Sequence, residues 1–220
     1  HVTCTERGLY LAMTCKETLL NNGFSDDQAK VVYKRPCDLG LLKDVPVYAN
    51  LLICDMFDDG LLSSGLIPAC RHALDNLLLP DAIVLPSAAT VYVQAVELRT
   101  RDVCGLDMSA INAHRWHPAY TAGVPFGNEA YIPLSNVAQC FHFDMLSPPE
   151  TADEMVFELT FERPGLFNAL IFWYDLAMGE GGEVFSTGPE AVEAGLSTLR
   201  PALQYMPGEM RVEEGLVLPI

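Results

Sequence analysis

Three carboxylates each follow a short apolar run in the first part of the sequence. They are Glu6, Asp38 and Asp55. In an open α/β sheet, ligands bind beyond the carboxyl ends of the strands. A carboxylate in that position can accept both hydrogen bonds from a ribose diol, and an acid after the next strand can accept one from an adenine amino group. The pattern therefore favours a nucleoside site, although acids at strand ends are also common as solvated loop residues.

Alternating strands and helices are predicted to position these acids within residues 1–85. Asn22 and Gly23 form a stop signal after the first helix. Residues 49–54 are continuously apolar, which predicts a strand buried on both faces. Strands that alternate with helices predict a parallel, doubly wound sheet. The predicted strands are residues 2–5, 31–33, 49–54 and 82–85, and the predicted helices are residues 9–20 and 66–79.

The pattern changes at Pro86. Polar and apolar residues then alternate with period two, and the alternating segments are joined by loops rich in Pro and Gly, which predicts an antiparallel barrel or sandwich. Residues 102–147 are poorly periodic. We therefore expect two domains, residues 1–85 and 86–220. The strands predicted in the second domain are residues 90–97, 155–162 and 167–176.

Composition limits the classes of partner. The chain has 220 residues, with 13 Lys and Arg against 29 Asp and Glu, a net charge of −16. This acidity argues against direct binding of nucleic acid and is compatible with a cationic partner, but it is also compatible with solubility alone. No apolar run approaches the ~20 residues that cross a bilayer. The seven cysteines never form a CxxC pair, which predicts reduced thiols and no structural zinc. We expect a soluble cytoplasmic or nuclear protein.

Several segments together resemble the protein arginine methyltransferases, most closely the type-seven branch. The resemblance is almost gapless from Glu6 to Glu97, weakens over residues 98–149 and then returns. It implies the C-terminal part of a Rossmann-like class I methyltransferase domain that binds S-adenosylmethionine, followed by an antiparallel β-barrel that binds the substrate and is incomplete at its end. The segments that carry the resemblance are residues 22–26, 46–58, 65–73, 89–97, 172–176 and 204–207.

The resemblance also implies residue roles. Glu6 matches the family's ribose-binding carboxylate, and Asp38, preceded by Cys37, matches the acid that meets the adenine amino group. Asp55 matches the first of two glutamates that clamp the substrate guanidinium. Arginine stays protonated at physiological pH, and two carboxylates can hold its planar fork. The implied cofactor is S-adenosylmethionine, and the implied partners are an Arg-containing protein substrate and a second methyltransferase unit, in a homodimer or as the other half of one chain.

The sequence departs from the family pattern at the clamp. Asp55 is one methylene shorter than glutamate, which removes roughly 1.5 Å of reach. The second glutamate is replaced by Ser64, which cannot pair with a cation. Asp58 and Asp59 lie in the same loop and are the candidates to compensate for it. A misplacement of about 1 Å can cost ~100-fold in rate. The clamp is therefore predicted to be degenerate.

Two further family features are missing. Residues 198–199 stand where the family has a His-Trp pair. No glycine-rich turn precedes the first carboxylate, so we expect weakened cofactor binding and little activity from this chain alone, as part of a longer protein. The glycines within residues 179–182 follow a barrel strand and predict a hairpin loop instead.

Other candidate sites carry less support. His114 and His117 have a spacing that could ligate a metal, but no third ligand is evident, so a structural role is expected. Cys54 could be a reactive thiol, but cysteines at the ends of buried strands are more often inert. The Gly-x-Ser-x-Gly motif of serine hydrolases is absent.

Two functions from different classes remain. The first is an S-adenosylmethionine-dependent arginine methyltransferase, in which Asp55 with Asp58 or Asp59 holds the guanidinium. The second is a catalytically inactive scaffold that keeps the fold and binds other proteins. Ser64 and the missing His-Trp pair motivate this alternative.

Overall fold

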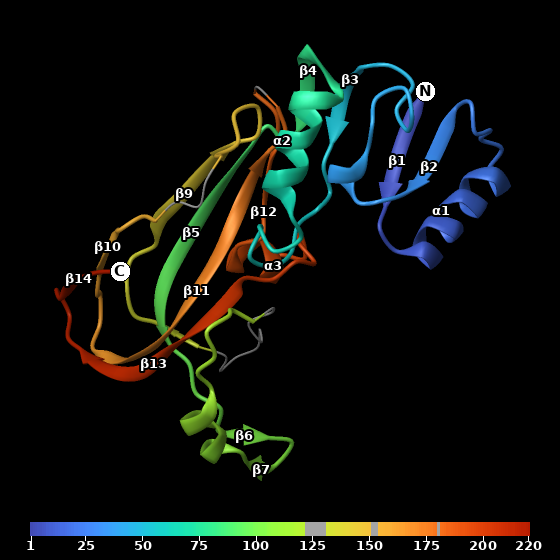
Figure 1. Cartoon of the computed structure of the whole chain (residues 1–220). Helices are drawn as coiled ribbons and strands as arrows, with labels where there is room; N and C mark the ends of the chain where they lie inside the picture. Colours follow the sequence, from blue (N-terminus) through green and yellow to red (C-terminus); the bar gives the residue numbers. More distant parts are fainter. Residues whose placement is uncertain (122–130, 151–153, 180) are drawn as a thin grey trace.

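The structure is a computed structural model that describes residues 1–121, 131–150, 154–179 and 181–220 (Figure 1). Parallel strands and helices form its first part. These are β1 (Val2–Glu6), α1 (Leu9–Asn21), β2 (Ala29–Tyr33), the 3₁₀ helix η1 (Pro36–Asp38), β3 (Ala49–Ile53), α2 (Leu66–Asn76) and β4 (Leu78–Leu85).

The parallel strands of the first part pair two by two. β1 lies parallel to β2, with Glu6 opposite Tyr33. β3 lies parallel to β4, with Ile53 opposite Leu85. The predicted parallel strands and alternating helices are confirmed. The carboxyl ends of both members of each pair lie at the same edge, which is the geometry that a nucleoside site requires.

The prediction that residues 49–54 are buried on both faces was wrong. Leu51 and Ile53 of β3 are 44% and 69% exposed. Within the described residues β3 pairs only with β4, in a two-stranded sheet. An apolar run shows that a strand is able to be buried, but burial itself depends on the elements that cover it.

Both predicted helices are present, but α2 ends at Asn76, before the predicted end at residue 79, because Leu78 and Leu79 belong to β4. In α2 the buried positions Leu66, Ala69, Cys70 and Ala73 recur every three or four residues, so one face packs on the core. α1 buries only Ala12. It ends where Asn22 and Gly23 predicted: Gly23 has a φ of 84°, and its N–H donates to the carbonyl of Leu20 at 3.0 Å.

The second part is dominated by antiparallel strands. Its elements are β5 (Ala88–Glu97), β6 (Asp102–Val103), β7 (Leu106–Asp107), the 3₁₀ helix η2 (Ser109–His114), β8 (Ile132–Pro133), β9 (Ala138–Asp144), β10 (Glu158–Thr160), β11 (Gly165–Ala177), β12 (Val184–Ser186), the short helix α3 (Pro189–Glu193), β13 (Ala202–Val212) and β14 (Val217–Pro219).

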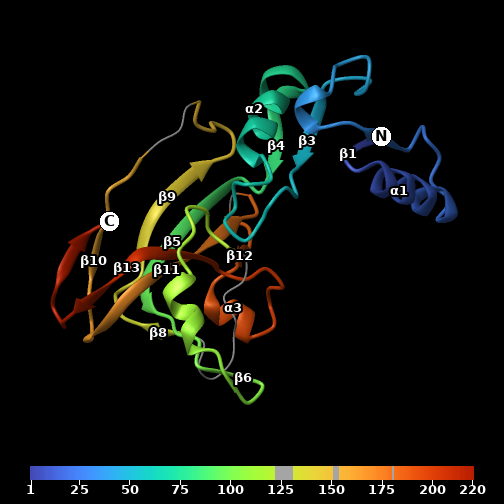
Figure 2. The same ribbon diagram turned by 60° about the horizontal axis from the view of Figure 1, so that its bottom comes forward.

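β5 and β11 form the centre of this part. They pair antiparallel over nine residue pairs, from Ala169–Val96 to Ala177–Ala88. β8 and β9 extend the other edge of β5, while β12 and β13 extend the other edge of β11. A bridge between Ser135 and Phe161 then connects the β8–β9 side to β10, which pairs with β14. The strands curl round one core, as Figures 1 and 2 show.

The predicted strand over residues 155–162 and the predicted hairpin at residues 179–182 are both present, the strand in shortened form. The strand predicted over residues 155–162 is shorter, because only Glu158–Thr160 is regular. Residues 179–182 connect β11 to β12 in a hairpin, as predicted, although Glu180 lies outside the described residues. The poorly periodic stretch, residues 102–147, forms β6, β7 and η2 and then β8 and β9 of the barrel sheet. β6 and β7 project from the barrel (Figure 1).

One apolar core runs through both parts. It contains Leu66 and Cys70 of α2 as well as Phe161, Phe167 and Tyr174 of the barrel strands. α2, β3 and β4 lie between the barrel and the β1–β2–α1 unit (Figure 1). The loop between β3 and α2 is therefore held at the junction of the two architectures. No helix within the described residues has the length and apolarity needed to span a bilayer.

Candidate functional site

The loop that follows β3 contains three of the predicted site residues. We call residues 55–64 the acidic loop. Leu61 anchors it: its side chain is completely buried in the core, although its backbone has a φ of 75°. Such a conformation is unfavourable for a side chain with a Cβ, so burial must compensate for the strain. Gly65 then takes a φ of 85° and begins α2. The three acids lie between the end of β3 and Leu61, so both ends of their segment are fixed.

Asp58 is the most highly connected acid of the loop. Its Oδ1 accepts a hydrogen bond from the Ser63 N–H at 3.1 Å, and its Oδ2 accepts one from the Tyr120 hydroxyl at 2.5 Å. Its backbone carbonyl accepts a hydrogen bond from the Tyr174 hydroxyl at 3.0 Å and another from the Leu61 N–H at 2.9 Å. Both ends of this residue are thus attached to the barrel.

The three acids of the loop affect the phenol of Tyr174. Burial raises the pKa of its phenol, and Asp58, Asp59 and Asp55 raise this pKa further, in that order of effect. A negative charge opposes ionisation of a phenol only when it lies nearby in a poorly solvated environment. The acidic loop therefore lies against the buried end of Tyr174, whose hydroxyl donates to the Asp58 backbone carbonyl.

The other two acids of the loop differ in exposure, and Asp59 is half-buried like Asp58. Asp55 is exposed. Asp59 Oδ1 accepts a hydrogen bond from the backbone N–H of Arg200 at 3.2 Å. Arg200 directly follows residues 198–199, so this barrel segment reaches the acidic loop. Ser64 lies half-buried at the end of the loop.

The predicted adenosine-binding residues lie at the carboxyl edge of β1 and β2. Glu6 ends β1, and its Oε1 accepts a hydrogen bond from the Gly8 N–H at 2.6 Å. Asp38 is exposed in η1 beside Cys37, and its Oδ2 lies 3.3 Å from Arg35 Nε in an ion pair. The two carboxylates thus follow neighbouring parallel strands, with Glu6 oriented by backbone.

The β1–β2 edge and the acidic loop are linked through α2. His72 Nε2 lies 2.8 Å from the carbonyl oxygen of Leu39, the residue that follows η1. Beneath η1, Lys34 Nζ contacts both carboxylate oxygens of the buried Asp44 at 2.7 Å. The Lys34 ammonium and then the Gly40 N–H lower the pKa of Asp44. This ion pair closes the loop that presents Asp38.

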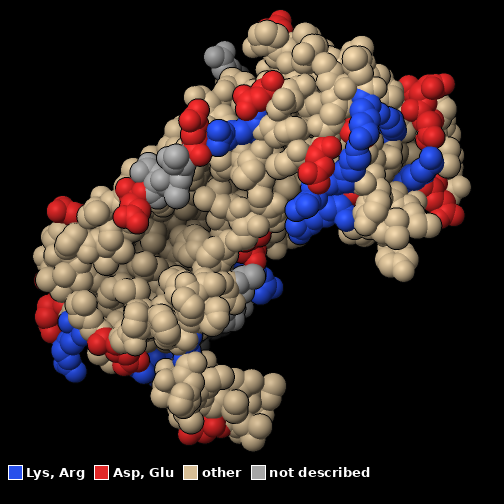
Figure 3. Space-filling view, viewed as in Figure 1, with Lys and Arg blue, Asp and Glu red and all other residues tan. Residues whose placement is uncertain are grey.

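Positive side chains are frequent in the first part of the chain, although the chain as a whole is acidic. Six of the 13 Lys and Arg residues lie within residues 1–45, and Figure 3 shows such a cluster over the first part of the molecule, flanked by acids. These are Arg7, Lys16, Lys30, Lys34, Arg35 and Lys43. The excess negative charge therefore belongs mainly to the rest of the chain.

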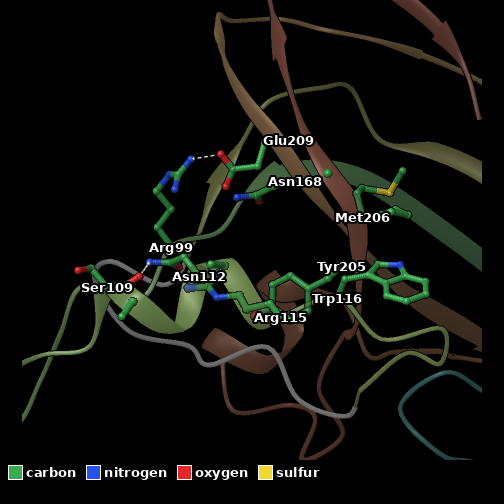
Figure 4. A pocket seen from close by; sticks show the side chains of 13 residues that line it. Arg99, Ser109, Asn112, Arg115, Trp116, Asn168, Tyr205, Met206 and Glu209 are labelled. Atoms are coloured by element: carbon green, nitrogen blue, oxygen red, sulfur yellow. Dashed lines mark hydrogen bonds and ion pairs between the residues drawn. The ribbon is translucent and has the colours of Figure 1, made fainter.

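A cavity of about 480 Å³ lies elsewhere, between η2 and β13 (Figure 4). Its cationic side chains are held by the protein itself. Arg99 pairs with Glu209 at 2.7 Å. Arg115 donates to the Leu98 carbonyl at 2.6 Å, and its guanidinium lies 5.2 Å from the centre of the Tyr205 ring. None of the predicted site residues lines this cavity.

The other sequence candidates take structural positions. His114 ends η2, and His117 Nδ1 accepts a hydrogen bond from the Ala119 N–H at 3.1 Å. Across the described residues no cluster of three His, Cys, Asp or Glu could hold a metal. Cys54 is buried, and a hydrogen bond from the Cys70 thiol lowers its pKa. All seven cysteines are free thiols.

Tyr120, Tyr174 and Ser63 were not predicted as site residues. Tyr174 had a usable signal, because the period-two pattern places it on the same face of β11 as the buried Leu176. Tyr120 had none. It lies in the poorly periodic stretch, 62 residues along the chain from the Asp58 side chain that it contacts.

Relatives of the chain are arginine methyltransferases. Protein arginine N-methyltransferase 7 of Drosophila erecta is 25% identical over 203 residues, which cover 83% of this chain and 29% of that protein. An arginine N(omega)-methyltransferase of Streptomyces achromogenes subsp. streptozoticus is 30% identical over 186 residues, which cover 81% of this chain and 50% of that protein. The chain thus spans less than a third of the Drosophila relative. No protein-family model matches it.

A solved structure shows the same fold. The chain aligns with the PRMT1 enzyme–prozyme heterotetrameric complex of Trypanosoma brucei with AdoHcy, with a TM-score of 0.71 and 19% identity. The alignment covers 98% of this chain and 68% of that chain. The predicted Rossmann-like methyltransferase part followed by a β-barrel is confirmed. The chain is homologous to the protein arginine methyltransferases and has their fold.

Proposed function

We propose that the protein is an S-adenosylmethionine-dependent arginine methyltransferase whose acidic loop binds the substrate guanidinium. The observation that carries this proposal is the acidic loop at the junction of the two parts, where Asp55 is exposed and the Asp58 and Asp59 carboxylates are held by hydrogen bonds. Within a homologue of arginine methyltransferases, a group of carboxylates after the third strand is suited to a permanently protonated guanidinium.

The residues at the β1–β2 edge fit the adenosine end of the cofactor. Glu6 is oriented by the Gly8 N–H, so its carboxylate can accept from a ribose diol. Asp38, beside Cys37 on the next strand end, is exposed and can accept from an amino group. When bound, S-adenosylmethionine would supply an electrophilic methyl group. The trypanosomal PRMT1 complex, which has the same fold as this chain, was solved with AdoHcy.

The acidic loop would contribute by positioning. Two carboxylates can accept parallel hydrogen bonds from one guanidinium and fix the direction of the remaining nitrogen. Asp55 is exposed and accessible to an incoming arginine, while Asp58 and Asp59 are fixed by backbone donors. Orientation of this kind supplies much of the rate of a direct displacement. We propose an Arg-containing protein as the substrate and a second methyltransferase unit as the partner.

A second candidate function is a catalytically inactive scaffold. Two observations favour it: Ser64 stands where the family has its second glutamate, and the carboxylates of Asp58 and Asp59 already accept hydrogen bonds from within the protein. A scaffold would keep the fold while losing the clamp.

Cofactor binding and methyl incorporation separate the two functions. The full-length protein would be titrated with S-adenosylmethionine in a calorimeter and then incubated with labelled cofactor and an Arg-Gly peptide. Saturable heat together with incorporation supports the methyltransferase. Heat without incorporation supports the scaffold. Absence of any heat contradicts the assignment of Glu6 and Asp38 to adenosine.

A further inference from the structure

Tyr120 occupies the carboxylate on which the proposed guanidinium site depends. Its hydroxyl donates to Asp58 Oδ2 at 2.5 Å, and the Ser63 hydroxyl in turn contacts the Tyr120 oxygen. The other carboxylate oxygen of Asp58 accepts from the Ser63 N–H. Asp58 therefore has each oxygen engaged by a neutral donor of the same chain.

The position of Tyr120 is specified by its surroundings. The following residue, Thr121, exchanges two backbone hydrogen bonds with Leu203 of β13, at 2.9 and 3.0 Å. The Tyr120 ring packs edge-to-face on Phe172, with ring centres 5.3 Å apart. Gly60 allows this approach, because a Cβ at this position would clash with the Tyr120 ring. The ring thus covers the acidic loop from the barrel side.

We propose that Tyr120 is an autoinhibitory latch, which competes with the substrate guanidinium for Asp58 and must be displaced before an arginine can bind. The inference rests on the proposed function, because it assigns the guanidinium to the acidic loop. A charged guanidinium forms stronger hydrogen bonds to a carboxylate than a neutral phenol does, so the substrate is able to win this competition. Burial and Asp58 raise the pKa of Tyr120, which keeps the phenol protonated as a donor near neutral pH.

The test compares guanidinium binding with and without the hydroxyl. Tyr120→Phe keeps the ring against Phe172 and frees Asp58 Oδ2. The dissociation constants of methylguanidinium and of a Gly-Arg-Gly peptide would be measured by calorimetry on the full-length protein. We expect Tyr120→Phe to bind both about tenfold more tightly than the unmodified protein, which equals about 1.4 kcal/mol.

Tyr92→Phe is the matched control. Tyr92 is a half-buried tyrosine on the same sheet, where it stacks on Trp173 away from the acidic loop. Its substitution should leave both dissociation constants within twofold. Unchanged or weaker guanidinium binding by Tyr120→Phe, or no binding by either protein, overturns the latch. Weaker binding would show that Tyr120 positions Asp58 instead.

A second variant keeps the test independent of folding. Ser63 is exposed, so Ser63→Ala should fold even if Tyr120→Phe does not, and it removes the hydroxyl that supports Tyr120. We expect a smaller gain in affinity, about threefold, and no gain overturns the latch. Methyl incorporation is measured in a separate assay. If Tyr120→Phe binds guanidinium more tightly but incorporates no methyl group, the latch is supported and the methyltransferase proposal is contradicted.

Discussion

The hydroxyl of Tyr174 offers a sharp test of how the barrel fixes the acidic loop. Tyr174 is completely buried in β11, and its hydroxyl donates to the Asp58 carbonyl. Tyr174→Phe removes this one donor and leaves the ring in place. Because the ring keeps its contacts with the core, no cavity opens, and the change isolates the hydrogen bond.

The expected loss of unfolding free energy depends on the hydrogen bonds that the Asp58 carbonyl keeps in Tyr174→Phe. This oxygen still accepts from the Leu61 N–H at 2.9 Å, so it is not left without a donor. The expected loss is therefore that of one neutral hydrogen bond, about 1 kcal/mol, and not the ~2–3 kcal/mol of an orphaned buried group. For a chain of this length, 1 kcal/mol lowers the melting temperature by about 2–4 °C.

Urea unfolding followed by circular dichroism would measure the free energy, and Tyr33→Phe is the control. Tyr33 ends β2 and is 55% exposed, so its hydroxyl should contribute less than ~0.5 kcal/mol. A Tyr174→Phe protein as stable as the unmodified one would show that the hydroxyl makes no useful contact with the loop. A loss above ~3 kcal/mol would show that the Leu61 donor does not satisfy the carbonyl.

Three further changes probe other parts of the molecule. Asp55→Ala should abolish methyl incorporation while leaving the calorimetric cofactor affinity unchanged, and retained turnover would show that another carboxylate holds the guanidinium. Phe161→Ala, at a completely buried position, should cost about 3–5 kcal/mol in urea unfolding, whereas Phe24→Ala, at a 48% exposed position, should cost far less. The lowered pKa of Asp44 means that its ion pair stabilises the fold above the unfolded pKa of about 3.9. Asp44→Asn should therefore be less stable than the unmodified protein at pH 7, with the difference shrinking as the pH falls below 4, and a difference of the same size at pH 3 would contradict this role.

Local patterns predicted the elements well. The stop at Asn22 and Gly23, the buried stripe of α2 and the period-two alternation of β5 all depend on residues close together in the chain, and all three are present. The grouping of Asp55, Asp58 and Asp59 was predictable for the same reason, because one loop holds all three.

Long-range features were not predictable from one sequence. The exposure of Leu51 and Ile53 depends on which elements cover β3, and that information is not contained in an apolar run. The contact between Tyr120 and Asp58 depends on how the barrel segment around Thr121 attaches to β13. No residue spacing signals a contact between two loops that fold against each other from distant parts of the chain.

The positive φ of Leu61 has a consequence for how this protein can change over evolution. Few residues can replace Leu61, because its side chain must be apolar and its backbone must adopt a left-handed conformation. Glycine would relax the backbone but would leave a cavity in the core. A β-branched side chain would fill the core but would raise the conformational energy of the backbone further. Asp55 carries none of this packing, because its side chain is exposed. Substitutions that alter the chemistry of the loop can therefore accumulate while its shape persists.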